Sequence, residues 1–261
     1  MALSSGGGRP RCKPWAGKRK RSNEGDDVQK NFVLVHGAWH GGWCWRRVAD
    51  RLQAAGHKVW TPTLTGLGER SHLIGGHVDL STHVTDIVNL LKWERLSDVV
   101  LCGHSYGGFV ISQVVEAMPE AITALIFVDA LLPEHGDSVA SVASPAIRAR
   151  IGEAQARGEA TVAPTSATVF RVNEVDRAWV DGLCTPQPLA TLTQQAVLTG
   201  ARERIASKTY IRAKGYESPQ FDAVLAKLRA MATWRTFELD CGHDIMVDMP
   251  DALAQILVKA A

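Results

Sequence analysis

The sequence predicts an α/β fold with a mostly parallel central sheet and helices on both of its faces. Short apolar segments typical of buried strands alternate with segments of helical periodicity along most of its 261 residues. The pentapeptide G-H-S-Y-G at residues 103–107 lies between one such strand and one such helix. The alternation stops after a strand ending at Asp129 and returns near residue 208. The interruption, at about residues 133–204, predicts a small, mainly helical cap inserted into the sheet domain.

The first half of the predicted domain contains three strands and two helices. The strands are expected at residues 31–36, 57–61 and 98–102. Apolar residues at helical spacing predict a helix over residues 43–55, followed by a glycine suited to end it. After a long glycine-rich loop, Ser81 is a plausible N-cap for the second helix.

The second half begins with the helix after the pentapeptide, which is expected to end near Ala117 because Pro119 follows. Strands are then expected at residues 123–129, 208–213 and 234–239, and the chain closes with a helix. We find no internal repeat.

Ser105 is the candidate nucleophile. A G-x-S-x-G sequence between a strand and a helix is typical of a nucleophile elbow, in which a strained turn presents the serine. Side chains at Gly103 and Gly107 would collide with neighbouring backbone. A glycine-rich turn with an incidental serine is the alternative, and the flanking strand and helix make it less favourable.

His243 is the candidate general base, because it lies on a loop directly after the last predicted strand. The segment H-G-A at residues 36–38 follows the first strand. Serine hydrolases with a nucleophile elbow place an oxyanion-hole amide at this position. The chain order of oxyanion loop, serine and histidine is that of the α/β-hydrolases.

Composition excludes several other classes of protein. The chain has no run of about 20 apolar residues that would predict a membrane span. Its nine histidines form no metal-binding pattern with carboxylates, so we expect neither a metal nor a cofactor. The five cysteines are scattered, which favours reduced thiols and a cytoplasmic location.

The N-terminal residues 1–29 are expected to form a disordered basic tail ahead of a hydrolase domain at residues 30–261. Residues 1–30 contain eight basic and three acidic side chains, whereas the remainder contains 21 basic and 24 acidic ones. The tail could be a localisation signal or an anion-binding segment, but its glycines, serines and prolines favour simple disorder. The acidic body argues against nucleic-acid binding.

Residues 32–43 resemble the start of plant methylesterases, salicylate-binding esterases and hydroxynitrile lyases, a branch of the α/β-hydrolase superfamily. Residues 64–73 and 103–108 resemble bacterial esterase-like members of the same branch. The resemblance covers about residues 30–260. It implies an α/β-hydrolase fold and a serine esterase acting on a small-molecule ester.

The resemblance also implies roles for individual residues. Ser105 would be the nucleophile and His243 its general base, and the backbone amides of Ala38 and Tyr106 would form the oxyanion hole. The aromatic side chains that could line an apolar pocket are Trp39, Trp43, Tyr106, Phe109, Phe170 and Trp179.

The acid of the triad is less clear from the sequence. Plant relatives place it after the strand that corresponds to residues 210–213, where this chain has no aspartate in register. Asp129 ends the strand that follows the elbow helix, a position used by some α/β-hydrolases such as haloalkane dehalogenases. We therefore favour Asp129 over Glu217 and Asp222. Two further aspartates, Asp240 and Asp244, are expected to have surface roles on the histidine loop.

A carboxylesterase is the function that the sequence favours. A ligand-binding, receptor-like protein with little turnover is the main alternative. A hydroxynitrile lyase is less favourable, because members of that kind carry a threonine at the position of Ala38 and a lysine at that of Asp244. The oligomeric state and the ester specificity are not encoded in any pattern that we recognise.

Overall fold

A six-stranded parallel sheet forms the centre of the computed structural model, which describes residues 29–75 and 77–261. The strand order is β2-β1-β3-β4-β7-β8, and every neighbouring pair is parallel. The mostly parallel sheet predicted from the sequence is confirmed, whereas the predicted basic tail lies almost entirely outside the described residues. The strands are β1 (Asn31–Val35), β2 (Lys58–Trp60), β3 (Val99–His104), β4 (Ile122–Val128), β7 (Ser207–Ala213) and β8 (Arg235–Leu239).

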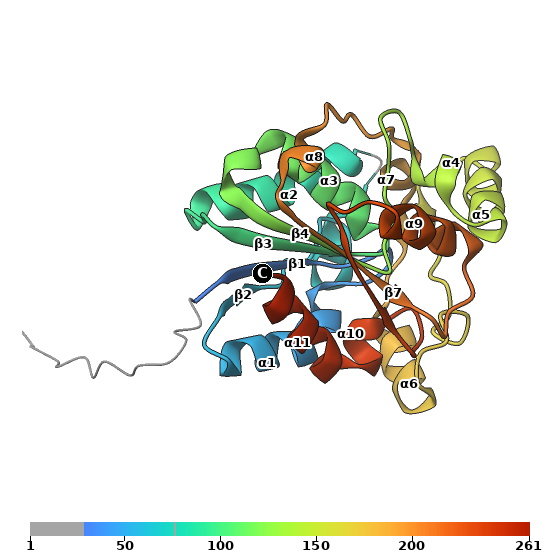
Figure 1. Cartoon of the computed structure of the whole chain (residues 1–261). Helices are drawn as coiled ribbons and strands as arrows, with labels where there is room; N and C mark the ends of the chain where they lie inside the picture. Colours follow the sequence, from blue (N-terminus) through green and yellow to red (C-terminus); the bar gives the residue numbers. More distant parts are fainter. Residues whose placement is uncertain (1–28, 76) are drawn as a thin grey trace, which may run out of the picture.

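Helices cover both faces of the sheet (Figure 1). On one face α1 (Arg46–Ala54) packs against α11 (Pro250–Ala260), and on the other α2 (Leu80–Trp93) packs against α3 (Gly107–Ala117). The sheet is buried on both sides, as the fully buried strand β3 illustrates. The remaining elements of this part are η1 (Gly42–Trp45), η2 (Gly68–Leu73), η3 (Pro119–Ala121), α9 (Pro219–Arg229) and α10 (Ile245–Asp248).

The N-cap of α2 differs from the one expected from the sequence. Asp79, not Ser81, caps this helix: its carboxylate accepts a hydrogen bond from the Thr82 amide at 2.9 Å. The Thr82 hydroxyl lies 3.3 Å from the Asp79 amide, which completes a capping box. Ser81 lies within the first turn, and its amide donates to Gln194 Oε1 at 2.9 Å.

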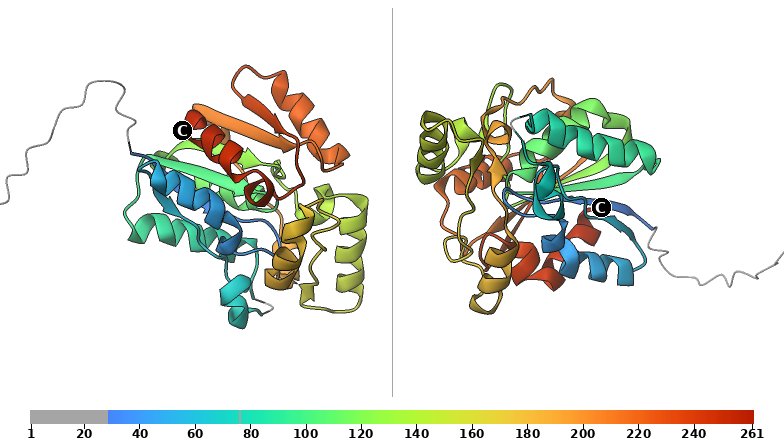
Figure 2. Two further views of the ribbon diagram at one scale, coloured as in Figure 1. Left: turned by 90° about the horizontal axis from the view of Figure 1, so that it is seen from below. Right: turned by 180° about the vertical axis from the view of Figure 1, so that it is seen from behind.

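The chain between β4 and β7 forms a layer at the carboxyl ends of the sheet strands (Figure 2). Its regular elements are mainly helices, and it also contains a two-stranded antiparallel sheet that the sequence did not predict. Strands of two residues are too short to show alternation. The elements are α4 (Val139–Val142), α5 (Pro145–Ala156), β5 (Thr161–Val162), α6 (Glu174–Leu183), β6 (Gln187–Pro188), α7 (Leu189–Thr193) and α8 (Ala201–Arg204).

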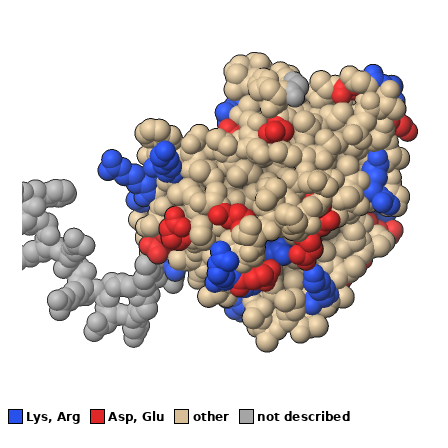
Figure 3. Space-filling model, turned by 90° about the horizontal axis from the view of Figure 1, so that it is seen from above, with Lys and Arg blue, Asp and Glu red and all other residues tan. Residues whose placement is uncertain are grey.

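Charged side chains are dispersed on the face seen in Figure 3. Lysine and arginine side chains lie beside aspartate and glutamate side chains, and uncharged residues make up most of this face. The surface on this side of the molecule therefore offers no continuous field of one sign.

Candidate active site

Ser105 lies in a tight turn between β3 and α3. Its backbone φ is +52°, in the left-handed region that is strained for a residue with a side chain. A Cβ atom at Gly103 would lie 2.7 Å from the carbonyl oxygen of Gly107, and one at Gly107 would lie 2.9 Å from that of Val35. The glycines of the pentapeptide are thus required by close backbone approach, as the sequence predicted.

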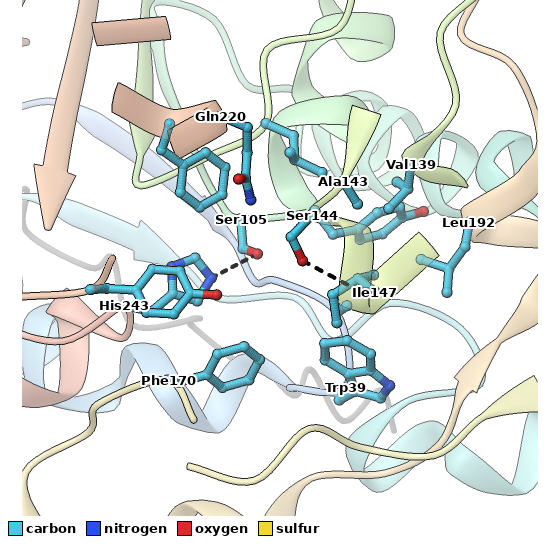
Figure 4. Close-up of a pocket in the computed structure, with 15 residues that line it drawn as sticks. Trp39, Ser105, Val139, Ala143, Ser144, Ile147, Phe170, Leu192, Gln220 and His243 are labelled. Atoms are coloured by element: carbon cyan, nitrogen blue, oxygen red, sulfur yellow. Dashed lines mark hydrogen bonds between the residues drawn. The ribbon is translucent and has the colours of Figure 1, made fainter. Parts of the chain in front are cut away.

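Ser105, His243 and Asp129 form a continuous chain of contacts. Ser105 Oγ lies 2.9 Å from His243 Nε2 (Figure 4), and Asp129 Oδ2 lies 2.6 Å from His243 Nδ1. An ionised carboxylate can only accept, so Nδ1 carries the ring proton. The lone pair on Nε2 is then directed at the serine hydroxyl, which is the arrangement that nucleophile activation needs.

Asp129 is held by contacts that the sequence did not reveal. The side chain is fully buried at the end of β4, and its φ of +41° turns the backbone sharply there. Its Oδ1 atom accepts hydrogen bonds from Arg212 Nη1 at 2.9 Å and from the Ala213 amide at 3.0 Å. Arg212 is itself buried on β7 and compensates the buried negative charge.

The other two candidate acids do not contact His243. The Glu217 side chain is 90% exposed and lies 3.8 Å from Arg171. Asp222 is in the first turn of α9, where its Oδ1 atom accepts from Arg212 Nε at 2.9 Å. Asp222 therefore binds Arg212 and does not contact His243.

Ala38 and Tyr106 line the same pocket as Ser105. A Cβ atom at Gly37 would lie 2.9 Å from Ser105 Cβ, so the loop that contains Ala38 packs directly against the elbow. Neither the Ala38 amide nor the Tyr106 amide donates a hydrogen bond within the described part of the chain. The Trp39 amide, in contrast, donates to Gln187 Oε1 at 2.9 Å. Two backbone donors thus remain available beside the serine.

Asp244 corrects an expectation from the sequence. It is fully buried, not on the surface, and its Oδ2 atom lies 3.0 Å from His40 Nε2. Burial alone would raise the pKa of the Asp244 carboxyl, but the charge and hydrogen bond of His40 outweigh burial and hold it well below its usual range. Burial likewise opposes the charged form of His40, yet Asp244 raises the His40 pKa. Its neighbour Asp240 is exposed, as expected.

His104 contacts the backbone of the loop that contains His243. Its Nε2 atom lies 3.0 Å from the carbonyl oxygen of His243, and the two rings are 4.5 Å apart between centroids. Burial, aided by the charge of His243, lowers the pKa of His104 well below its usual range, so this ring is neutral and donates from Nε2. The residue before the serine therefore positions the residue expected to be the base.

The pocket above Ser105 is largely apolar. Of the aromatic residues proposed from the sequence, Trp39, Tyr106 and Phe170 contribute to its wall. The other three lie elsewhere: Phe109 is in the core, and Trp43 packs edge-on against Trp179. The remaining lining residues are Leu131, Val139, Ala143, Ser144, Ile147, Leu192, Tyr216, Gln220 and Phe221.

Residues 29–75 and 77–261 contain no group of three or more His, Cys, Asp or Glu side chains placed to hold a metal ion. None of their helices has the length and apolar character needed to cross a bilayer.

Comparison with known proteins identifies the family of this chain. Residues 32–256 match the model of the alpha/beta hydrolase family. The carbendazim hydrolyzing esterase of Nocardioides sp. (strain SG-4G) is 41% identical over 236 residues, which are 87% of this chain and 98% of that protein. This chain therefore belongs to the alpha/beta hydrolase family, as the sequence resemblance implied.

Solved structures support the fold. An extracellular alpha/beta-hydrolase from a Paenibacillus species, described as sharing homology with tobacco salicylic acid binding protein 2, has a TM-score of 0.78 at 24% identity, covering 89% of this chain and 99% of its own. The methylesterase protein MES16 from Arabidopsis has a TM-score of 0.71 at 22% identity, covering 88% and 98%. At these identities the likeness concerns the fold alone.

Proposed function

We propose that this protein is a serine carboxylesterase that hydrolyses small to medium carboxylic esters through an acyl-enzyme intermediate. The observation that carries the proposal is the chain of contacts from Ser105 through His243 to Asp129, which opens into a largely apolar pocket. An esterase of the alpha/beta hydrolase type also agrees with the 41% identical relative.

The first half of the reaction forms the acyl-enzyme. His243 Nε2 removes the proton of Ser105 as Oγ attacks the ester carbonyl carbon. The carbonyl oxygen becomes an oxyanion that accepts from the amides of Ala38 and Tyr106, and each such donor contributes about 3–4 kcal/mol in the transition state. The intermediate collapses when His243 passes the proton to the departing alkoxide.

The second half releases the acid. A water molecule takes the place of the alcohol, loses a proton to His243 and attacks the acyl carbon; Ser105 is then expelled with that proton. Asp129 stays ionised throughout and stabilises the imidazolium that forms twice per cycle. The Arg212 guanidinium and the Ala213 amide hold its second oxygen in place.

The segment at residues 133–204 is proposed to be the cap that selects the substrate. It contributes to the pocket wall from four separate places: Val139 on α4, Ile147 on α5, Phe170 before α6 and Leu192 on α7. The wall is apolar at these positions, which favours esters with an aliphatic or aromatic part. Carbendazim, the compound in the name of the 41% identical relative, therefore belongs in the substrate panel.

The two alternative functions are less well supported. A receptor without turnover would not need the serine and the histidine in hydrogen-bond contact. For a hydroxynitrile lyase, this chain lacks the threonine hydroxyl at Ala38 and the ammonium at Asp244. Asp244 is not on the pocket wall, so it is the missing ammonium rather than a repelling carboxylate that disfavours this reaction.

We also propose a cytoplasmic location. The four cysteines in the described part of the chain, Cys44, Cys102, Cys184 and Cys241, are all free thiols. Free thiols fit a reducing compartment. Fractionation of the native source with an antibody against the chain tests this location.

The function is tested by hydrolysis of p-nitrophenyl acetate and carbendazim by the wild type, Ser105→Ala and the exposed control Ser81→Ala. We expect the wild type and Ser81→Ala to be equally active and Ser105→Ala to lose at least a thousandfold in kcat, because loss of the nucleophile of a serine hydrolase can cost about a millionfold. Full activity in Ser105→Ala would refute the mechanism. A folded wild type that binds but never cleaves any ester of the panel would favour the receptor alternative.

A further inference from the structure

The pocket wall contains polar side chains that the proposed reaction does not use. Ser144 caps α5, where its hydroxyl accepts from the Ile147 amide at 3.4 Å. The Tyr106 hydroxyl lies 2.9 Å from His83 Nδ1. The Gln220 carboxamide, in contrast, has no hydrogen-bond partner within the described part of the chain, and Figure 4 shows it directed into the pocket toward Ser105.

The backbone of Gln220 is fixed by both of the residues that follow it. Phe221 is buried and stacks on the imidazole of His243, with ring centroids 5.6 Å apart and planes 14° apart. Asp222 accepts the hydrogen bond from the buried Arg212. The carboxamide is therefore presented from a rigid first turn of α9, which reduces the entropy lost when it binds a partner.

The geometry also indicates which part of the ester Gln220 meets. The alcohol must leave toward His243 Nε2, which protonates it. The wall around His243 is formed by Phe221, Tyr216 and Phe170, whose ring centroids lie 5.6, 4.8 and 5.1 Å from that of the histidine. Gln220 immediately precedes Phe221 in the sequence and lines the same pocket. The cap side chains Val139, Ile147 and Leu192 are purely apolar and suit the acyl part.

We propose that Gln220 is a specificity-determining residue that selects esters whose alcohol part carries a hydrogen-bonding group, such as an amide or a ring N–H next to a carbonyl. A carboxamide offers both a donor and an acceptor, so it matches an amide reciprocally. An alcohol part without such a group leaves the carboxamide unpaired in an apolar pocket, which disfavours its binding. This inference rests on the proposed esterase function.

The test uses two esters of the same shape, 3-acetamidophenyl acetate and 3-isobutylphenyl acetate. We measure kcat/KM for both with wild type, Gln220→Leu and Gln53→Leu, an exposed position on α1. The ratio between the two esters should fall about tenfold in Gln220→Leu, the effect of losing one well-placed hydrogen bond. It should not change in Gln53→Leu. Comparing ratios between variants cancels the different reactivities of the two phenols.

A second pair moves the amide to the acyl part: phenyl 3-acetamidopropanoate and phenyl 5-methylhexanoate. Their ratio should be the same in wild type and Gln220→Leu. An unchanged ratio for the first pair, or an effect on the acyl pair instead, overturns the inference while leaving the esterase function intact. Hydrolysis of p-nitrophenyl acetate but of neither pair by the folded wild type overturns this inference alone, whereas hydrolysis of no ester at all refutes the esterase function and this inference with it.

Discussion

Asp129 uses its two carboxylate oxygens for two different purposes. One oxygen contacts His243 Nδ1, and the other is occupied by Arg212 and by the Ala213 amide. Because the second oxygen is already bound, the carboxylate cannot rotate without breaking two hydrogen bonds. A single buried side chain thereby sets both the orientation and the tautomer of the imidazole.

Asp129→Asn tests this assignment. An asparagine amide can donate to Nδ1 and so favours the wrong tautomer, and we expect kcat to fall by roughly a thousandfold to ten-thousandfold. Glu217→Gln, at an exposed site, should keep full activity. The measurement is p-nitrophenyl acetate hydrolysis together with a thermal melt that shows each variant to be folded. Activity of Asp129→Asn within threefold of the wild type would move the role to another carboxylate.

The elbow and the end of β4 are joined at the level of whole elements. The Ser105 carbonyl oxygen accepts from the amides of Gly108 at 3.1 Å and Leu131 at 3.1 Å. A Cβ atom at Gly108 would lie only 1.9 Å from the Leu131 carbonyl oxygen. The first turn of α3 is therefore in direct backbone contact with the chain that leaves β4, and this contact keeps Ser105 and Asp129 in register.

Gly108→Ala should separate these two elements. We expect a loss of about 2–4 kcal/mol in the free energy of unfolding, since backbone must move to accept the methyl group. The matched control is Gly152→Ala in the exposed part of α5, where a Cβ atom meets nothing within 4 Å. That variant should gain about 0.5–1 kcal/mol. Urea unfolding measures the free energy of unfolding of both variants. An equal change in the two would contradict the close backbone contact at Gly108.

Buried histidines give the whole molecule a pH-dependent stability. Burial lowers the pKa of His36 to about 3 and that of His83 to about 4. The pKa of His40 is raised instead, because Asp244 outweighs burial. Between pH 6.5 and these lowered values, the unfolded chain binds protons that His36 and His83 do not bind in the folded state. Above pH 6.5 the folded state keeps a proton on His40 that the unfolded chain has lost.

Stability should therefore be greatest near pH 6.5. Below it, the free energy of unfolding should fall by about 1.4 kcal/mol per pH unit for each histidine with a lowered pKa. Above pH 6.5 the free energy of unfolding should decline less steeply, because only His40 keeps a proton in the folded state that it has lost in the unfolded chain. Urea unfolding from pH 5 to 8 measures both slopes. His83→Gln should reduce the acid slope by about one proton, and the exposed control His72→Gln should leave it unchanged. Stability that rises continuously from pH 6.5 to 5 would contradict this explanation.

Local sequence patterns were sufficient to predict the central sheet and the tight turn at Ser105. The central strands β1, β3 and β4 are short, largely apolar runs, and the glycines around Ser105 show where backbone segments approach closely. The sequence could also name Ser105, His243 and Asp129, because strand ends and the loops after them converge at one edge of a parallel sheet. The structure brings these three side chains into hydrogen-bond contact.

Contacts between distant segments could not be predicted in the same way. The burial of Asp244 depends on His40, which is 204 positions away in the sequence. Arg212 is a charged residue within a buried strand, and such a residue is a sequence signal that indicates a buried partner of opposite charge. Gln220 carries no signal at all, because nothing in its helix shows that its side chain enters a pocket.

The contact at Gly215 restricts which side chains the loop after β7 can carry. A Cβ atom there would lie 2.6 Å from the Cys241 carbonyl oxygen, and the next acidic side chain, Glu217, is directed into solvent. Any side chain at position 215 would therefore press against the loop that contains both Cys241 and His243. A carboxylate could be accommodated at that position only if the histidine loop shifted with it.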